Sequence, residues 1–329
     1  KFNVKGFDES PYAAQVANYL GTHHSTIECN YEEGIDLIEN FGTYYDEPFA
    51  DSSAIPTMLL SKYTSQHVTV ALSGDAGDES FLGYHRYKWI KQVKPLFKAS
   101  ESFRKALAHC INLSPYYKHK LIAMGISMKN VEHLYVKILF GNMENSWVKN
   151  QDIAKYDYYT DLLIQSSKPL LERLSDFDIK TYLNGDINTK VDRASMAFSL
   201  ESRSPLMDYR VIEFAKSLPT NFKYQGNNQK RILKDILFER VPSSFFNRPK
   251  AGFTMPFQHW FRNELKEYVM DNLTKERLKN IPGIHVNRTE EIINEHMTGK
   301  WNRYPQIWKL LVLSQWISKN KTEAQMAYV

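Results

Sequence analysis

The chain of 329 residues is 43% apolar and 13% aromatic, which excludes a short peptide ligand, a disulfide knot and a wholly disordered protein. Forty-two Lys and Arg residues against 37 Asp and Glu give a net charge of +5. Such a small excess over the whole chain does not predict a nucleic-acid-binding protein. We interpret the basic stretch 88–105 as a solvated helix face.

The cysteines and the hydropathy pattern bear on the setting of the protein. Cys29 and Cys110 are the only two cysteines, too few for a disulfide framework, so a reduced, cytoplasmic setting is favoured. Apolar runs all fall well short of the roughly 20 residues that span a bilayer. We therefore expect neither a membrane nor a nucleic acid as partner.

Strand and helix signals alternate over the first 90 residues. In chain order we predict a strand at 2–7, a helix at 12–20 ended by Gly21, a strand at 25–29, helices at 33–45 and 55–66, and a strand at 68–72. The last run reads VTVAL, which is β-branched, continuous and bounded by polar residues. That composition favours a strand covered on both faces of a parallel sheet. The alternation indicates an α/β layer.

Helical patterns replace the strand signals after about residue 90. We predict helices at 130–141, 162–174, 187–202, 209–217 and 304–319. The stretch 91–127 is where a change of subdomain is expected.

A turn rich in small and acidic residues, SGDAGDE, follows VTVAL directly at 73–79. In open α/β sheets, ligands bind beyond the carboxyl ends of strands, and helix N-termini suit phosphates. The carboxylates of Asp75, Asp78 and Glu79 would repel a phosphate unless Mg²⁺ or a basic side chain intervenes. In the alternative, this is a plain strand-to-helix turn in which Asp78 and Glu79 only favour the helix dipole.

The motif LSGDAGDESFLGYHRY resembles the second signature of the synthetase domain of the glutamine-hydrolysing asparagine synthetase family. Further matches follow in family order: Gly6 with Phe7, LGTHH at 20–24, DEPFADSSAIPT at 46–57, KVDRASMAFSLESRSPLMD at 190–208, KRILK at 230–234 and RPKAGFTMPFQHW at 248–260. The resemblance implies an α/β fold with a partial parallel sheet of the adenine-nucleotide alpha hydrolase kind, followed by a mostly helical remainder. One synthetase domain would then cover 1–329, with a nucleotide-binding layer at 1–90 and a mainly helical part at 91–329.

The resemblance also implies a reaction. A carboxylate, aspartate in most of the family, attacks the α-phosphorus of ATP bound with Mg²⁺, and ammonia then displaces AMP from the acyl-adenylate. The chain would be an ATP-dependent ligase that forms a C–N bond. Two alternatives stay open: amidation of another carboxylate, such as a sugar acid in surface polysaccharide synthesis, and a non-catalytic binding module.

The family's functional residues carry over to individual positions. Lys250 and Lys230 match lysines that face phosphate, and Asp75 stands where many members have Glu; these three are the expected catalytic residues. The nucleotide-binding positions that match are Ser73, Gly74, Lys5 and Gly6. Asp78 is the candidate to hold Mg²⁺ through the phosphates.

A second group of charged residues has two interpretations. Asp78, Glu79, Asp192, Glu201 and Arg203 could line the acceptor site, or they could form structural ion pairs. A buried pair is favoured for Glu201 and Arg203, since paired charges tolerate burial.

Two parts expected from the resemblance do not occur in the sequence. The Ser-Gly-Gly motif of the family's pyrophosphate loop is absent, and residue 1 is Lys rather than the catalytic cysteine of a glutaminase domain. We therefore expect a fragment of a longer enzyme that receives ammonia from a glutaminase domain not included here. Such a fragment alone would bind ATP weakly and catalyse little. A homodimer is an open alternative for its assembly.

Overall fold

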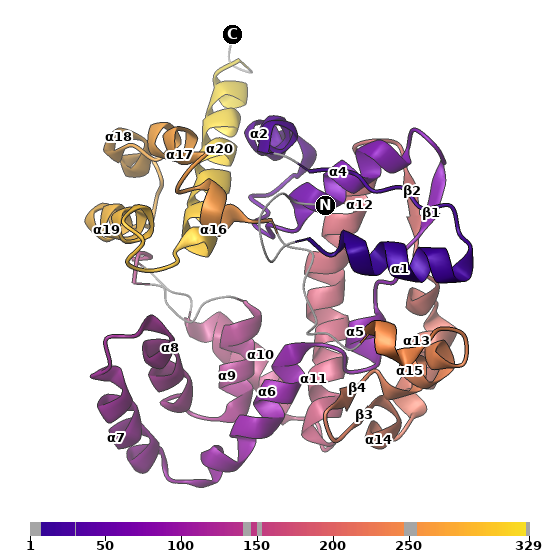
Figure 1. Ribbon diagram of the computed structural model, residues 1–329. Helices are drawn as coiled ribbons and strands as arrows, with labels where there is room; N and C mark the ends of the chain where they lie inside the picture. Colours follow the sequence, from indigo (N-terminus) through magenta and orange to yellow (C-terminus); the bar gives the residue numbers. More distant parts are fainter. Residues whose placement is uncertain (1–7, 30, 141–145, 150–152, 247–254, 327–329) are drawn as a thin grey trace. The chain divides into compact units, whose positions relative to one another are not determined.

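The computed structural model describes residues 8–29, 31–140, 146–149, 153–246 and 255–326 (Figure 1). The predicted strand at 2–7 and the site residues Lys5, Gly6 and Lys250 lie outside these ranges. The chain forms two compact units. Unit 1 comprises 1–72, 188–203 and 237–329, and unit 2 comprises 73–187 and 204–236.

Unit 1 is built from helices and a small parallel sheet. Its elements are α1 (Ser10–Leu20), α2 (Tyr31–Glu39), α3 (Phe41–Tyr44), α4 (Ala54–Thr64), β1 (Val70–Leu72), α12 (Thr189–Met196), β2 (Glu201–Arg203), η4 (Ser243–Phe246), α16 (Phe257–Trp260), α17 (Lys266–Asn272), α18 (Lys275–Lys279), α19 (Val286–Met297) and α20 (Tyr304–Met326). The strands β1 and β2 pair in parallel, with Val70 opposite Glu201 and Leu72 opposite Arg203.

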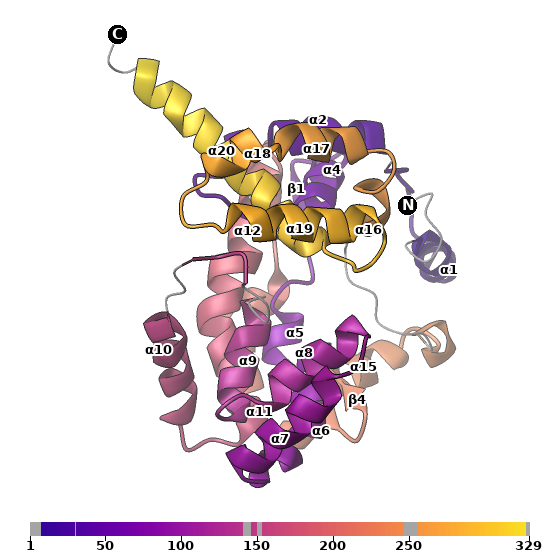
Figure 2. The same ribbon diagram turned by 90° about the vertical axis from the view of Figure 1, so that its left-hand side faces the viewer.

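Aromatic packing against α20 forms the core of unit 1. Trp308 stacks on Phe257 with ring centroids 5.0 Å apart and meets Phe41 edge-on at 5.3 Å. All three rings are buried, so α20 holds α3 and α16 together. Figure 2 shows α16 to α19 gathered around α20.

Unit 2 is almost wholly helical. Its elements are α5 (Gly77–Ser80), α6 (His85–Val93), η1 (Lys94–Lys98), α7 (Glu101–Asn112), α8 (Tyr117–Ile126), α9 (Val131–Leu139), α10 (Ile153–Ile164), α11 (Leu170–Asp178), the π-helical η2 (Ile179–Asn188), η3 (Pro205–Met207), α13 (Tyr209–Ser217), α14 (Thr220–Lys223), β3 (Tyr224–Gln225), β4 (Asn228–Gln229) and α15 (Arg231–Phe238), whose last two residues belong to unit 1. Its core joins α6, α9 and α11 through Tyr87, Leu134, Tyr135 and Leu174.

Local sequence explains where several helices begin and end. Gly21 takes the left-handed conformation that ends α1, with φ of +65° and its N–H bonded to the carbonyl of Asn18. The hydroxyl of Ser100 accepts the N–H of Phe103 at the start of α7, and Asn130 caps α9 in the same way.

Most predicted helices are found. The predictions at 12–20, 55–66, 130–141, 209–217 and 304–319 correspond to α1, α4, α9, α13 and α20, with shifted ends except in α13. The prediction at 33–45 is divided at Asn40 into α2 and α3. The α/β class and the helical remainder are thus confirmed.

One predicted strand is wrong, and two predicted helices are only partly correct. Residues 25–29 form no strand, because β propensity alone does not supply a hydrogen-bonded neighbour. The prediction at 162–174 is interrupted between α10 and α11, where Pro169 has extended backbone angles. The prediction at 187–202 ends at Met196, since Ser199 adopts a φ of +54° and the chain turns into β2.

The expected burial of the VTVAL strand is also wrong. The strand forms and pairs in parallel, but Val70 is exposed and Leu72 is 75% exposed. A continuous apolar run shows that both faces of a strand tolerate burial. It does not show that layers cover both faces.

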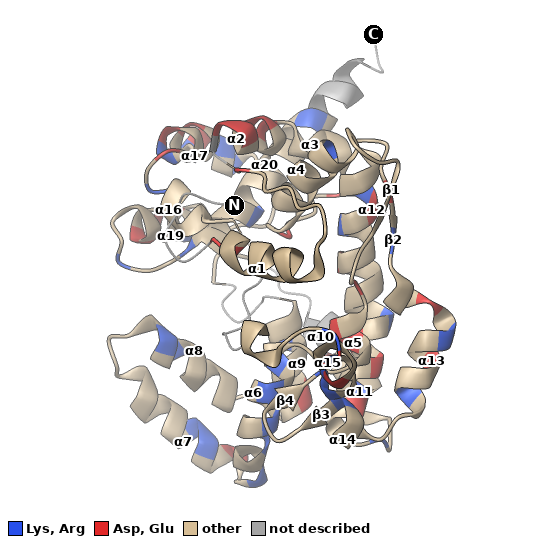
Figure 3. Cartoon of the chain, turned by 45° about the vertical axis from the view of Figure 1, so that its right-hand side comes forward, with Lys and Arg blue, Asp and Glu red and all other residues tan. Residues whose placement is uncertain are grey.

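Positive charge is concentrated in unit 2. Residues 85–129 contain ten Lys and Arg residues and a single acidic residue, Glu101, a net charge of +9. The rest of the chain is therefore at −4, so the positive charge is unevenly distributed along the chain. Figure 3 shows this charge on α6, α7 and α8. No helix in the described part of the chain is long and apolar enough to cross a bilayer.

Candidate active site

The turn that follows β1 is fixed by two serine hydroxyls. Ser73 Oγ donates to Asp75 Oδ2 at 2.8 Å. Ser204, the residue after β2, donates its Oγ to the carbonyl oxygen of Asp75 at 2.7 Å. The backbone of Asp75 is therefore fixed at its carbonyl, and its carboxylate is oriented by Ser73. Gly74, between them, is exposed.

Close packing follows immediately along the chain. Ala76 has a φ of +67° and leads into α5. A Cβ on Gly77 would lie 2.9 Å from Leu206 Cδ1, and a Cβ on Gly83 would lie 2.0 Å from Asp78 Oδ1. Side chains at either glycine would displace these neighbours. By contrast, a Cβ on Gly74 would meet no atom within 4 Å, so the folded turn itself does not require glycine there.

Lys230 lies against this turn. The order of motifs in the sequence did not predict this contact. Its Nζ is 2.8 Å from Asp78 Oδ1, and its N–H donates to the carbonyl of Phe81. The preceding residue, Gln229, donates its amide Nε2 to the carbonyls of Leu82 and Tyr84 at 3.0 and 2.7 Å. The structure thus brings together two predicted site residues, Asp78 and Lys230, that are distant in the sequence.

The backbone of Lys230 is unusual. Its φ of +52° lies in the left-handed region, which non-glycine residues rarely adopt. Lys230 stands just before α15, and its carbonyl accepts the N–H of Lys234. Lys234, in the first turn of α15, donates its Nζ to Asn228 Oδ1 at 3.0 Å. The two lysines therefore lie one helical turn apart, and their side chains contact different partners. Burial and the neighbouring Lys230 lower the pKa of Lys234.

Glu79 points into unit 2 rather than to solvent. It is 1% exposed, and its Oε1 accepts the hydroxyl of Tyr84 at 2.5 Å. Its carbonyl accepts Ser175 Oγ, on α11, at 2.7 Å. Burial raises the pKa of Glu79, an effect that the hydrogen bond from Tyr84 opposes. Glu79 therefore anchors α5 to the helices beneath it.

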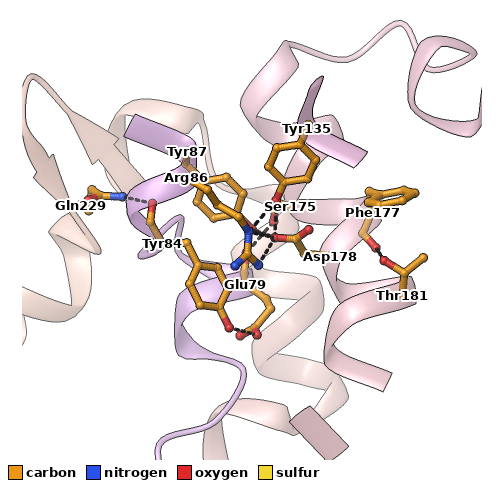
Figure 4. Close-up of polar contacts among 10 residues, drawn as sticks. All are labelled: Glu79, Tyr84, Arg86, Tyr87, Tyr135, Ser175, Phe177, Asp178, Thr181 and Gln229. Atoms are coloured by element: carbon orange, nitrogen blue, oxygen red, sulfur yellow. Dashed lines mark hydrogen bonds and ion pairs between the residues drawn. The ribbon is translucent and has the colours of Figure 1, made fainter. Parts of the chain in front are cut away.

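A buried polar cluster under the turn was not predicted from the sequence (Figure 4). Asp178 at the end of α11 is fully buried, and its Oδ2 accepts from Arg86 Nη2 at 2.7 Å, Tyr87 Oη at 2.5 Å and Tyr135 Oη at 2.6 Å. Burial raises the pKa of Asp178, and the charge of Arg86 opposes that rise. The cluster joins α6, α9 and α11. A signal did exist: Asp178 lies at helical spacing after Leu171 and Leu174, on an otherwise apolar helix face.

Aromatic rings enclose the guanidinium of Arg86. Its Cζ lies 3.5 Å from the ring centroid of Tyr84 and 4.6 Å from that of Tyr182. Such contacts stabilise a desolvated cation. Tyr84 therefore contacts Arg86 through its ring and Glu79 through its hydroxyl, which links the cluster to α5.

The predicted residues of the 190–203 segment lie in unit 1. Lys190 Nζ contacts Asp51 Oδ2 at 2.8 Å and Ser53 Oγ at 2.9 Å. Burial acts to raise the pKa of Asp51, but the pair with Lys190 outweighs it and the pKa is lowered. Asp192 is exposed.

Glu201 and Arg203 pair as one interpretation predicted. Arg203 Nε donates to Glu201 Oε1 at 2.7 Å. Both side chains are more than half exposed, so the expected burial of this pair is wrong. The cause is the alternation of a strand: residues 201 and 203 share the face of β2 that solvent reaches.

The carboxylate oxygens of the turn are suited to Mg²⁺ that is also bound by the phosphates of a nucleotide. Among the described residues, no group of three or more His, Cys, Asp or Glu side chains could hold a metal ion by itself. Asp75 and Asp78 nevertheless supply carboxylate oxygens of the kind that binds Mg²⁺ through one or two carboxylates and substrate phosphates. The residues therefore fit magnesium delivered with a nucleotide.

Comparisons with known proteins agree with the motif order. The asparagine synthase family profile matches residues 1–318. The chain is 29% identical to asparagine synthetase [glutamine-hydrolyzing] 1 of Bacillus subtilis over 97% of its own length and 51% of that protein. It is 26% identical to a putative asparagine synthetase of Mycobacterium bovis over 96% and 49%. The amidase chyE of Penicillium rubens is 21% identical over 89% and 48%.

The extent of these matches has two consequences. The chain spans about half the length of these curated relatives. The profile, however, covers almost the whole chain rather than one motif. The chain therefore belongs to the asparagine synthase family.

Proposed function

We propose that the chain is the synthetase part of an ATP-dependent enzyme that converts a carboxylate, aspartate first among the candidates, into its amide. The observation that carries this proposal is the juxtaposition of the acidic turn and Lys230, 2.8 Å from Asp78, in a chain matched from 1 to 318 by the family profile. The phosphates of ATP need a nearby cation and close access to backbone N–H groups. Lys230 supplies the cation, and the small residues of the turn allow the close access.

The fold that we propose is the one expected from membership of the asparagine synthase family. Residues 1–90 would contribute to a nucleotide-binding layer of the adenine-nucleotide alpha hydrolase kind. The helical remainder of 91–329 would complete one synthetase domain. The nucleotide would meet Ser73 and Gly74 at the turn, and Lys5 and Gly6 through backbone atoms.

The chemistry comprises two displacements. An oxygen of the acceptor carboxylate bonds to the α-phosphorus of ATP, and the bond from that phosphorus to pyrophosphate breaks. Ammonia then bonds to the acyl carbon, the bond to AMP breaks, and the ammonia nitrogen loses its surplus proton. Magnesium bound with the nucleotide supplies charge neutralisation of the phosphates.

In this scheme, residues of the chain bind the phosphates and orient the adenylate. Lys230 turns from Asp78 to phosphate oxygens, and Lys250 contacts the leaving pyrophosphate. Asp78 would hold the magnesium that accompanies the phosphates. Asp75, oriented by Ser73, positions the adenylate or moves a proton there. Electrostatic stabilisation and positioning supply most of the rate enhancement in such transfers.

The test uses the protein as its gene encodes it, with ammonia or glutamine as nitrogen source. Pyrophosphate release and amide formation are measured with aspartate and, separately, with other carboxylates. We expect asparagine as product and loss of pyrophosphate release in Lys250→Ala. Full activity of Lys250→Ala would reject the role of Lys250. If no pyrophosphate is released with any carboxylate, the chain is a binding module and the enzymatic proposal fails.

A second acceptor is favoured by one observation. The similarity to a protein named amidase chyE extends over 89% of this chain. A relative with a different name supports an acceptor other than aspartate. Pyrophosphate release with a different carboxylate, and none with aspartate, would select this candidate.

A further inference from the structure

Unit 2 has a strongly basic face that the proposed reaction does not use. We call residues 85–129, which form α6, η1, α7 and α8, the basic segment. Its net charge of +9 stands against −4 for the rest of the chain. Figure 3 shows its Lys and Arg residues with almost no acidic neighbours on the same helices. Because charge of one sign repels itself, such a concentration disfavours folding unless a partner neutralises it.

The charge that reaches solvent comes from lysines. Arg86 is occupied by Asp178, and buried Arg104 donates Nη1 to the carbonyls of Ile126 and Met128 at 2.8 and 2.5 Å. Both arginines therefore serve the fold. The lysines exposed on the basic segment are Lys91, Lys94, Lys98, Lys105, Lys118 and Lys129.

Large apolar side chains stand among these lysines. Leu113 is 77% exposed, Tyr116 63%, Phe103 58% and Ile122 42%. They lie on α7, on α8 and in the turn that joins them. The opposite faces of these two helices close on a small core of Ala108, Ala123 and Ile126. The exposed side chains are therefore not core residues of this helix pair.

We propose that the basic segment docks on a membrane surface that contains anionic phospholipids. An interfacial helix combines lysines, which meet lipid phosphates, with apolar side chains, which enter the boundary of the acyl chains. The α7–α8 turn carries exposed Leu113 and Tyr116, and exposed Lys118 follows on the first turn of α8. Charge complementarity selects anionic rather than neutral lipid, and the inference is independent of the proposed reaction.

Nucleic acid is the less fitting partner. Its recognition draws on arginine for bidentate phosphate contacts, and neither arginine of the basic segment offers one, since Arg86 pairs with Asp178 and Arg104 is buried. The aliphatic side chains of Leu113 and Ile122 would gain nothing from a phosphate backbone. On a bilayer they would leave water.

Sedimentation with vesicles tests the proposal. The protein is mixed with vesicles of phosphatidylcholine alone and of phosphatidylcholine with phosphatidylglycerol. We expect binding only to the second, weakened by salt as screening requires. The variant Lys94→Gln/Lys98→Gln/Lys118→Gln should bind those vesicles less well by a factor on the order of 100, at about five-fold for each lysine.

Matched variants separate the lipid from other partners. The control Lys62→Gln/Lys266→Gln/Lys279→Gln removes the same charge from exposed positions of unit 1 and should bind like the wild type. Phe103→Ser/Leu113→Ser should weaken vesicle binding and leave the circular dichroism spectrum unchanged, since both side chains are exposed. Equal binding to both kinds of vesicle, equal loss in the control, or binding of RNA but not of anionic vesicles would overturn the proposal.

Discussion

Arg86 Nη2 and Asp178 Oδ2 lie 2.7 Å apart in a largely buried ion pair that ties α6, the helix after the acidic turn, to the end of α11. Two tyrosine hydroxyls donate to the same carboxylate oxygen. A buried ion pair contributes little net stability by itself, but removing one partner leaves the other charge uncompensated. The pair therefore determines which arrangement of helices unit 2 can adopt.

The first prediction concerns this pair. Asp178→Asn should lower the free energy of unfolding by about 3–5 kcal/mol, because the charge of Arg86 stays buried without its partner. Asp176→Asn, two residues away on α11, removes a partly exposed carboxylate that pairs with Lys168 and Lys216, and should cost less than about 1 kcal/mol. Urea unfolding followed by circular dichroism measures both. Equal losses would show that burial of the pair is not decisive.

The second prediction is a pH dependence that arises from Glu79. Its folded pKa is raised by burial, whereas the unfolded carboxyl has a pKa of about 4.3. The folded state therefore binds a proton more readily than the unfolded state. Stability from this group is fully present below the unfolded pKa and is lost as pH rises toward the folded pKa.

Glu79→Gln should remove this dependence, since the amide imitates the protonated acid. The variant should be the more stable protein at pH 7, and its advantage should shrink to nothing as pH falls below about 4. Urea midpoints of the two proteins between these pH values measure the difference. A constant difference at every pH would mean that Glu79 does not titrate in this range.

The third prediction separates Gly74, in the acidic turn, from Gly83, which follows α5. Gly74→Ala should change the free energy of unfolding by less than about 0.5 kcal/mol, because its Cβ meets open space. If a nucleotide lies against this backbone, the same variant should bind ATP more weakly by about ten-fold or more. Gly83→Ala should instead destabilise unit 2, because its Cβ would collide with Asp78.

Calorimetric titration with ATP and thermal unfolding give the two readouts for these glycines. Unchanged ATP affinity in a stable Gly74→Ala protein would remove Gly74 from the nucleotide site. A stable Gly83→Ala protein would mean that Asp78 and Lys230 can move apart at little cost.

The fourth prediction compares two neighbouring lysines. Lys230→Met should lower kcat/KM by about 100-fold or more, as loss of one preorganised charge contact does. Lys234→Met breaks only the contact to Asn228 and should lower kcat/KM by less than about five-fold. Initial rates of pyrophosphate release measure both. Equally large losses in both variants would mean that Lys234 shares the role of Lys230. Equally small losses would mean that neither lysine contacts phosphate.

Motifs and local spacing were enough to predict the family, the α/β character and most helices. The motif order needs only local identity, and helices such as α1 and α13 arise from spacing and caps within about a dozen residues. Ser73, Gly74, Asp75 and Asp78 could be selected in the same way, because strand, turn and helix follow one another along the chain. Lys5, Gly6 and Lys250 remain predictions, since they lie outside the described residues.

Which charges meet, and which apolar residues are covered, became known only from the packing of the folded chain. Lys230 reaches Asp78, and Arg86 reaches Asp178, across long stretches of sequence, and no local pattern records such pairs. Burial also depends on neighbouring layers: Leu72 in an apolar strand is exposed, whereas Asp178 in a helix is buried. Composition gave a net charge of +5, but packing determined which basic residues of α6 to α8 reach solvent. The physical reason is common to all three cases: a side chain's energy is set by what surrounds it in space, and sequence spacing specifies only its nearest neighbours along the chain.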